Sequence, residues 1–150
     1  MKIIVLAGGL STERDVSLAS AAGICRTLIE KGHDAFLLDV FLGLEHAPEH
    51  LEDVFTLPGH EIAKNISCEE PDLAAVKASR PDQSDCFLGP NVIELCRLAD
   101  ITFLGLHGGE GENGKLQATF DLLGIRYTGP DSLGCAVAMD KGLTKQVFLQ

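Results

Sequence analysis

Within its first 40 residues the chain reads as a strand, a helix and a second strand, and this order constrains the fold strongly. Ile3 to Leu6 form a short apolar run that two glycines soon close, as expected for a strand buried on both faces of a sheet. From Val16 to Lys31, apolar residues recur at spacings of three and four, and Gly32 follows as a left-handed cap. Ala35 to Val40 supplies the second strand. Such a βαβ unit predicts parallel strands joined by a right-handed crossover.

Residues 41 to 90 interrupt this alternation. Scattered His, Pro and Gly positions break any long period there, and we interpret the stretch as an insertion. Beyond it the pattern predicts a helix at 91–98, a strand at 101–106, a helix at 115–123 capped by Gly124, a fourth strand at 125–128, and helices at 132–139 and 141–149. The expected fold is an α/β domain of three layers, with a mainly parallel sheet of about four strands flanked by helices.

Size and composition narrow the classes of function. The chain has 150 residues, close to the commonest size of a single domain. Its net charge of -10 and its 12 scattered basic residues argue against a nucleic-acid partner, because that binding relies on clustered Lys and Arg. The five cysteines form no C-x-x-C pair and no zinc-like spacing with His. With no signal-peptide core and no membrane-spanning apolar run, we expect a cytoplasmic protein without membrane contact.

The loop at residues 6 to 17 lies between a strand end and a helix start, the edge where ligands bind in open α/β sheets. Its glycines do not have the spacing of a dinucleotide or Walker phosphate motif. Glu13 at the helix entrance is favoured by about 0.3 to 1 kcal/mol through the helix dipole, and it would suit a ligand ammonium group. A stabilising acid at a helix start is the alternative. Thr12 with Asp15 fits a capping box, and Ser11 is an equally good cap.

A second loop, at residues 105 to 117, carries five glycines and His107. A histidine at the carboxyl end of a buried parallel strand can donate a hydrogen bond to a carboxylate or a developing oxyanion. The alternative is that it satisfies local backbone groups. Glu112 can orient a neighbour or cap the helix that begins near Lys115, and the spacing favours the cap.

A third segment, at residues 127 to 141, contains a strand end, a Gly-Pro turn and a helix with small residues. Asp140 and Lys141 stand at a predicted helix junction. A lysine there is either solvated or reaches a nucleotide phosphate as a mobile point charge, and the spacing does not choose between the two.

Together these segments resemble the D-alanine:D-alanine ligases of the ATP-grasp superfamily. The family's GG-x-S-x-E-x-x-V-S loop corresponds to residues 8–17, and its H-G and G-E-D-G-x-x-Q signature to 107–108 and 111–117. Its Y-T-G and M-D-K marks correspond to 127–129 and 139–141. Asn113 replaces the usual acid of the second signature, which leaves the role of that position open.

The resemblance implies a Rossmann-like, pre-ATP-grasp domain at residues 1–140, with 41–90 as a variable insertion and 141–150 as the start of a link to an ATP-grasp domain. It implies an ADP-forming ligase in which ATP phosphorylates the carboxylate of one D-alanine. The amine of a second D-alanine then attacks, giving D-alanyl-D-alanine for peptidoglycan. ATP and Mg²⁺ would be bound mainly by later domains, with Lys141 approaching the phosphates. We therefore expect the 150-residue chain alone to be inactive.

The resemblance also assigns residues to the first D-alanine. Glu13 would bind its ammonium group, directly or through a small network, and His107 would position or stabilise its carboxyl group. These two are the candidate catalytic residues, and the further candidate substrate-binding residues are Val16, Ser17 and Gly108. Ser17 would cap or orient the loop rather than react. No metal ligand is expected among them.

Three alternatives stay open at this level. A ligase for D-alanine with D-serine or D-lactate would differ in residues outside this chain. A free-standing small-molecule-binding domain without catalysis would require a natural stop after Gln150, and a final helix without a polar tail argues against that. A dinucleotide-binding module lacks its fingerprint. Members of the family commonly form dimers through this domain, so a homodimer is a further expectation.

Overall fold

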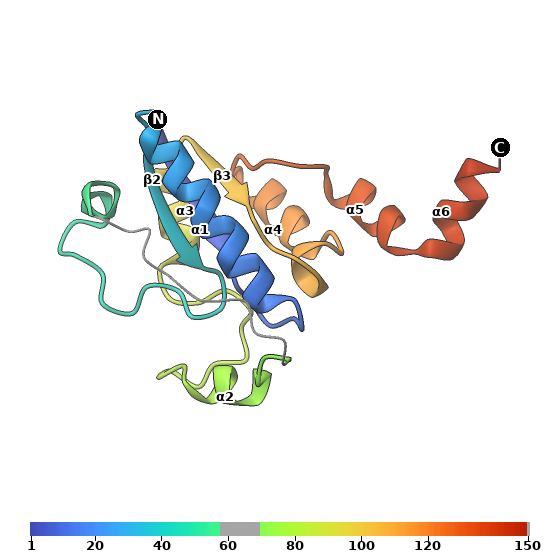
Figure 1. Ribbon diagram of the computed structural model, residues 1–150, viewed down its shortest axis with the longest axis horizontal. Helices are drawn as coiled ribbons and strands as arrows, with labels where there is room; N and C mark the ends of the chain where they lie inside the picture. Colours follow the sequence, from blue (N-terminus) through green and yellow to red (C-terminus); the bar gives the residue numbers. More distant parts are fainter. Residues whose placement is uncertain (58–69, 150) are drawn as a thin grey trace.

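The computed structural model describes residues 1–57 and 70–149, and its centre is a parallel sheet (Figure 1). The sheet has three strands in the order β2-β1-β3, namely β1 (Lys2–Ala7), β2 (Asp34–Asp39) and β3 (Ile101–Leu104). Val5 in the central strand lies opposite Leu37 on one side and Phe103 on the other. The expected α/β class and the parallel direction of the strands are confirmed.

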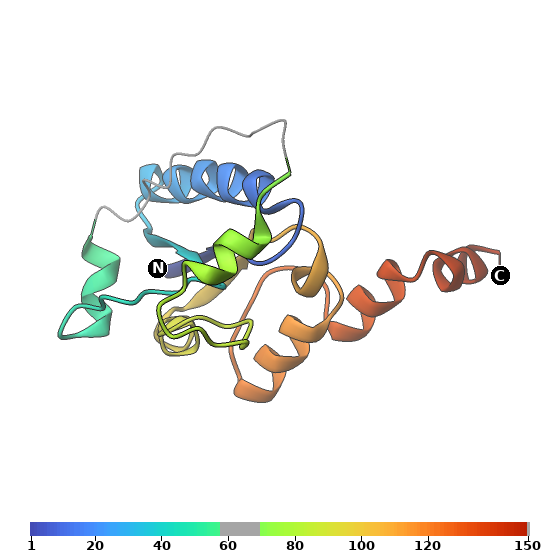
Figure 2. The same cartoon turned by 90° about the horizontal axis from the view of Figure 1, so that it is seen from below.

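Helices cover both faces of the sheet because β1 is apolar on both faces. Its odd-numbered residues pack against the buried residues of α1 (Arg14–Glu30), such as Leu18 and Cys25. Its even-numbered residues pack with α3 (Val92–Leu98), α4 (Lys115–Leu123) and the 3-10 turn η1 (Leu51–Thr56). Figure 2 shows α1 on one side of the sheet and α3 and α4 on the other. This arrangement gives the three layers that the sequence predicts.

The predicted fourth strand at 125–128 is reduced to one parallel bridge, between Thr102 and Tyr127. Thr102 donates its N–H to the carbonyl of Arg126, and its own carbonyl accepts the N–H of Thr128. Leu104, two residues further along β3, instead donates its N–H to the Thr128 hydroxyl at 3.1 Å. Gly129, with φ +108°, then turns the chain away. The sheet therefore has three strands rather than four, because a side chain takes the place of the next backbone acceptor.

Residues 41 to 90 are attached to the core at both ends, which the insertion hypothesis did not predict. Phe41 is fully buried, and the guanidinium carbon of Arg80 lies 4.9 Å from the centre of its ring. The two ends also exchange backbone hydrogen bonds, since Gly89 donates to Val40 and Leu44 donates to Pro90. The centre of the interpreted insertion, residues 58–69, lies outside the described residues. A short helix, α2 (Leu73–Ala78), precedes Arg80.

The C-terminal helices α5 (Ser132–Met139) and α6 (Lys141–Phe148) extend away from the sheet (Figures 1 and 2). Each begins at an aspartate whose side chain accepts a backbone N–H, Asp131 for α5 and Asp140 for α6. Gly32 and Gly124 end α1 and α4 with positive φ, as the sequence predicts. Among the described residues, no helix combines the length and the apolar character that crossing a membrane requires.

Candidate functional site

The loops at residues 6 to 17 and 105 to 117 meet at the carboxyl ends of β1 and β3. Ser17 joins them on their buried side. The Ser17 hydroxyl accepts the N–H of Gly8 at 2.9 Å and donates to the carbonyl of Gly105 at 2.7 Å. Ser17 is fully buried in the first turns of α1. Its hydroxyl thus has both of its hydrogen bonds inside the protein. These two bonds join the first loop to the second.

Ser11 joins the same loops nearer the surface. Its hydroxyl donates to the carbonyl of His107 at 2.6 Å and accepts the N–H of Glu13 at 3.1 Å. The N-cap of α1 is Glu13, and no side chain makes a capping hydrogen bond there. The predicted capping box of Thr12 and Asp15 is therefore wrong, and the Ser11 hydroxyl bonds to the loops instead.

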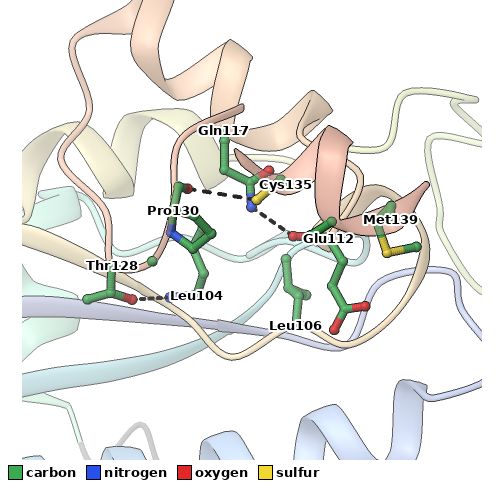
Figure 3. Close-up of a pocket in the computed structure, with 11 residues that line it drawn as sticks. Leu104, Leu106, Glu112, Gln117, Thr128, Pro130, Cys135 and Met139 are labelled. Carbon is green, nitrogen blue, oxygen red and sulfur yellow. Dashed lines mark hydrogen bonds between the residues drawn. The ribbon is translucent and has the colours of Figure 1, made fainter. Parts of the chain in front are cut away.

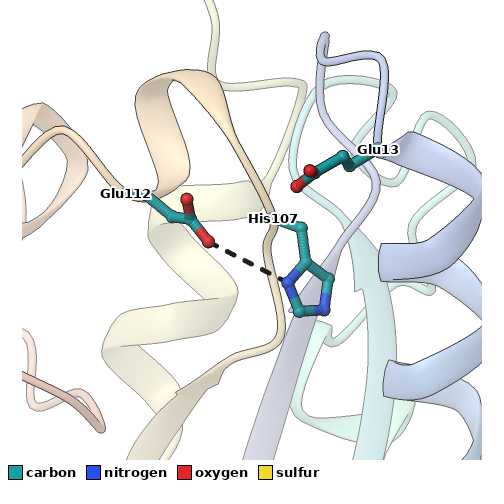
Figure 4. Close-up of side chains that lie close together, drawn as sticks. All are labelled: Glu13, His107 and Glu112. Atoms are coloured by element: carbon teal, nitrogen blue, oxygen red, sulfur yellow. Dashed lines mark ion pairs between the residues drawn. The ribbon is translucent and has the colours of Figure 1, made fainter. Parts of the chain in front are cut away.

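The side chains of Glu13, His107 and Glu112 gather above these loops (Figure 4). One carboxylate oxygen of each glutamate and one ring nitrogen of the histidine all lie within 4.8 Å of one another. Nδ1 of His107 is 3.9 Å from Oε1 of Glu112, and Nε2 is 3.3 Å from the hydroxyl of Ser20. The three side chains come from two loops far apart in the sequence. They form an open, acidic cluster with an imidazole at its centre.

Glu112 is in this cluster because it does not cap α4. The N–H of Lys115 is accepted by the side chain of Asn113 at 3.0 Å, and Gly114, with φ +90°, is the N-cap. The capping role predicted for Glu112 is therefore wrong. Asn113 takes that role, and the carboxylate of Glu112 is left to face His107.

The remaining candidate residues differ in their distance from the cluster. Gly108, with φ +70°, lies against Glu13, since a Cβ added to it would be 3.5 Å from Oε2 of that residue. Val16 is exposed in the first turn of α1, close in sequence to Glu13. Lys141 begins α6, which points away from the sheet (Figure 1). The structure brings Glu13, Ser17, His107 and Gly108 together, and it leaves Lys141 apart from them.

The two carboxylates of the cluster offer negative charge to a small cation, such as an ammonium group or a metal ion. Charge-assisted N–H···O bonds of about 2.8 Å, directed tetrahedrally, place their acceptors about 4.6 Å apart. Ligands at about 2.0 Å from a tetrahedral zinc ion lie about 3.3 Å apart. The 3.9 Å between His107 and Glu112 lies between these two spacings, so the distance alone does not select an ammonium group or a metal ion. A metal ion would require the loops to close around it.

Comparison with known proteins identifies the family. The family model described as D-ala D-ala ligase N-terminus matches residues 2–130. The chain belongs to this family. It is 45% identical over 149 residues to the D-alanine–D-alanine ligase of Lacticaseibacillus casei, covering 99% of this chain and 42% of that protein. It is 46% identical over 154 residues to the ligase of Pediococcus pentosaceus, covering 99% and 43%. The chain thus spans about two-fifths of the length of these relatives.

The fold is also similar to a solved ligase. The D-alanine–D-alanine ligase of Bacillus anthracis, in its complex with ATP, superposes with a TM-score of 0.60 at 22% identity, covering 99% of this chain and 35% of that one. At this identity the likeness concerns the fold alone. The family match, over residues 2–130, is what confirms that the glycine-loop motifs belong to a ligase N-terminal domain.

A buried ion pair supports the first loop of this ligase domain, and no motif in the sequence predicted it. The guanidinium of Arg14 pairs with Asp39 and donates to the carbonyl of Gly9 at 2.7 Å. Asp39 also accepts the N–H groups of Phe41 and Leu42, at 2.9 and 3.0 Å. The available signal was a lone acid at the end of an apolar strand, since a buried charge requires a partner.

A hollow of the ligase domain, about 310 Å³ in volume, adjoins the cluster and lies between β3, α4 and α5 (Figure 3). Its walls are mainly apolar, and they include Leu104, Leu106, Pro130 and Met139. Gln117 is buried in its wall and donates to the carbonyl of Gly111 at 2.9 Å. Glu112 contributes to both the hollow and the cluster. An apolar group bound here would therefore lie beside the acidic site.

Proposed function

We propose that this chain is the N-terminal, substrate-side domain of an ATP-dependent D-alanine:D-alanine ligase, and that it binds the first D-alanine. The observation that carries the proposal is the convergence of Glu13, His107 and Glu112 at the edge where the two family motifs meet. Its two carboxylates suit an ammonium group and its imidazole suits a carboxylate, and a small amino acid brings these two groups together. The 45% identity with the L. casei ligase supports the same substrate.

Each residue of the cluster has a distinct part in this binding. The carboxylates of Glu13 and Glu112 accept hydrogen bonds from the ammonium group. The imidazole of His107 would donate an N–H to the substrate carboxylate, and the same donor would stabilise the oxyanion that develops when the second amine attacks the acyl phosphate. Because Gly108 has no side chain, a ligand can approach the backbone between these groups. Val16, exposed on α1, would contact the methyl group of D-alanine.

The nucleotide would be held only in part by this chain. ATP supplies the phosphoryl group that activates the carboxylate, and Lys141 would contact its phosphates as a mobile charge. Lys141 is exposed and makes no salt bridge within the described part of the chain, so its ammonium is available. The single positive charge of Lys141, next to Asp140 at the start of α6, does not neutralise the negative charge of a triphosphate. We propose that ATP and Mg²⁺ are bound mainly by the ATP-grasp part of the ligase.

Because this chain would be only the substrate-side part of the ligase, we expect it to depend on the rest of the enzyme for activity. The chain matches about two-fifths of its relatives, and we propose that residues 141–150 lead from the substrate-side domain toward the ATP-grasp domain. The 150-residue chain alone would then make no dipeptide. Free, buried thiols such as Cys25 and Cys96 are in keeping with the reducing cytoplasm, where we place the reaction.

The test is a ligase assay on the full-length enzyme that carries this segment. With ATP, Mg²⁺ and D-alanine, we expect ADP release and D-alanyl-D-alanine detected by mass spectrometry. Glu13→Gln should raise the KM for the first D-alanine at least about tenfold, since a charged hydrogen bond is lost. Glu30→Gln, at the other end of the same helix, is the matched control and should leave that KM unchanged. A wild-type enzyme without dipeptide product would overturn the ligase proposal, and an unaltered KM for Glu13→Gln would overturn the assignment of the site.

A further inference from the structure

We infer that Ser11 is a positioning residue for the amino-acid site, because its hydroxyl sets the separation of Glu13 from His107. The inference rests on the proposed function, since it concerns the same site. The inference goes beyond the proposed function because it assigns the binding geometry to Ser11, which touches no substrate atom in the proposed arrangement.

One oxygen atom makes both contacts. The Ser11 hydroxyl donates its proton to the carbonyl of His107 at 2.6 Å, across 96 residues of sequence. The same oxygen accepts the N–H of Glu13 at 3.1 Å. The backbone of Ser11 adds a third contact, because its carbonyl accepts the N–H of Arg14 at 3.1 Å. A change in Ser11 therefore moves the backbones of both proposed substrate-binding residues relative to each other.

Close packing leaves this contact little freedom. A Cβ placed on Gly108 would lie 3.3 Å from both Cβ and Oγ of Ser11, so the two loops pass each other without a side chain between them. Ser17 holds the same loops together deeper in the protein, through Gly8 and Gly105. The loops are thus joined at two levels. Ser17 fixes where they leave the sheet, and Ser11 fixes where they present Glu13 and His107.

An ordinary helix cap does not account for these contacts. A capping serine accepts an N–H from the second or third residue of the helix and has no need to donate across the structure. The hydroxyl of Ser11 instead accepts from Glu13, which is itself the N-cap residue of α1, and donates to a different loop. Loss of a cap would lower the stability of α1. Loss of the donated bond would alter the position of His107, and hence the affinity for the substrate.

The experiment compares Ser11→Ala, Ser11→Thr and Ser79→Ala in the full-length ligase. Ser11→Ala removes both hydrogen bonds, and Ser11→Thr keeps the hydroxyl. Ser79 is the matched control, because within the described part of the chain its exposed hydroxyl bonds only to the nearby carbonyl of Val76. We expect Ser11→Ala to raise the KM for the first D-alanine about tenfold, with the KM for ATP within about twofold of wild type. Ser11→Thr should recover most of the loss, and Ser79→Ala should have no effect.

A double-mutant cycle provides the second readout. If Ser11 acts through His107, then Ser11→Ala combined with His107→Ala should raise the KM by much less than the product of the two single effects. A KM within twofold of wild type for Ser11→Ala, or multiplicative effects in the cycle, would overturn the inference. If Ser11→Ala does not fold, the comparison of Ser11→Thr with Ser11→Cys decides, since cysteine keeps the size and weakens the hydrogen bonds. A wild-type enzyme without dipeptide product would count against the proposed function instead.

Discussion

The guanidinium of Arg14 pairs with the carboxylate of Asp39 directly under the glycines of the first loop. Arg14 is 2% exposed and Asp39 is 6% exposed, so water screens the pair very little. Arg14 opens α1 immediately after Glu13, and Asp39 ends β2. The ion pair therefore connects the helix that carries Glu13 to the edge strand of the sheet.

Removing one partner of this pair should be costly. Arg14→Met leaves the Asp39 carboxylate buried without its cation, and we expect the free energy of unfolding to fall by about 3 to 5 kcal/mol. Lys77→Met is the matched control, because it breaks an exposed pair with Asp85, 2.6 Å long, that solvent screens. Urea unfolding followed by circular dichroism measures both. If the two variants lost the same stability, the buried pair would not be the anchor of the loop.

Replacing Gly8 and Gly23 with alanine should change the stability of the fold in opposite directions. At Gly8, with φ +73°, a Cβ would lie 2.3 Å from Oδ2 of Asp39, so Gly8→Ala should lower the melting temperature. At Gly23, inside α1, a Cβ would meet nothing within 4 Å, so Gly23→Ala should raise stability by about 0.5 to 1 kcal/mol. Differential scanning calorimetry tests both variants. A stable Gly8→Ala variant would show that Asp39 can move aside.

Alkaline pH should destabilise the fold through two buried thiols. Burial raises the pKa of Cys25 and of Cys96 to about 11, from an ordinary value of 9.0. Because the folded-state values lie above the unfolded ones, the stabilisation is complete below about pH 9 and is lost as the pH rises through 11. The pKa of Tyr127, which burial raises to about 12, adds to the loss at higher pH.

The melting temperature between pH 8 and pH 11 measures this effect. We expect a steady decline above pH 9 in the wild-type protein and a shallower decline in the double variant Cys25→Ala with Cys96→Ala. The variant will start from a lower stability because it has lost two buried side chains, so the slopes are compared and not the absolute values. Equal slopes would assign the alkaline loss to other groups.

Glu112 should matter for substrate affinity and its neighbour Glu110 should not. Glu112 faces His107 at 3.9 Å, whereas Glu110 pairs with Lys115 at 3.4 Å. In the full-length ligase, Glu112→Gln should raise the KM for the first D-alanine about tenfold, because it removes one acceptor charge from the cluster. Glu110→Gln should change that KM less than about twofold. Steady-state kinetics would contradict the assignment if both variants behaved alike.

Local features of the sequence predicted most of the elements. The βαβ unit, the parallel sheet and the glycine ends of α1 and α4 all follow from short-range periodicity and from backbone preferences. The predicted fourth strand does not form, and the apolar periodicity of the sequence does not reveal why. The Thr128 hydroxyl, at 3.1 Å, takes a ladder position beside Leu104 where a backbone carbonyl was expected.

The amino-acid sequence by itself determined the fold class, the family and the two loops that carry Glu13 and His107. Only the tertiary structure decided that Arg14 pairs with Asp39, that Ser11 bonds to His107, and that Glu112 joins the site instead of capping α4. The physical reason is that helix and strand patterns depend on neighbours a few residues away. Hydrogen bonds and ion pairs between loops depend on which strand ends the sheet brings together, and that is settled only when the chain has packed.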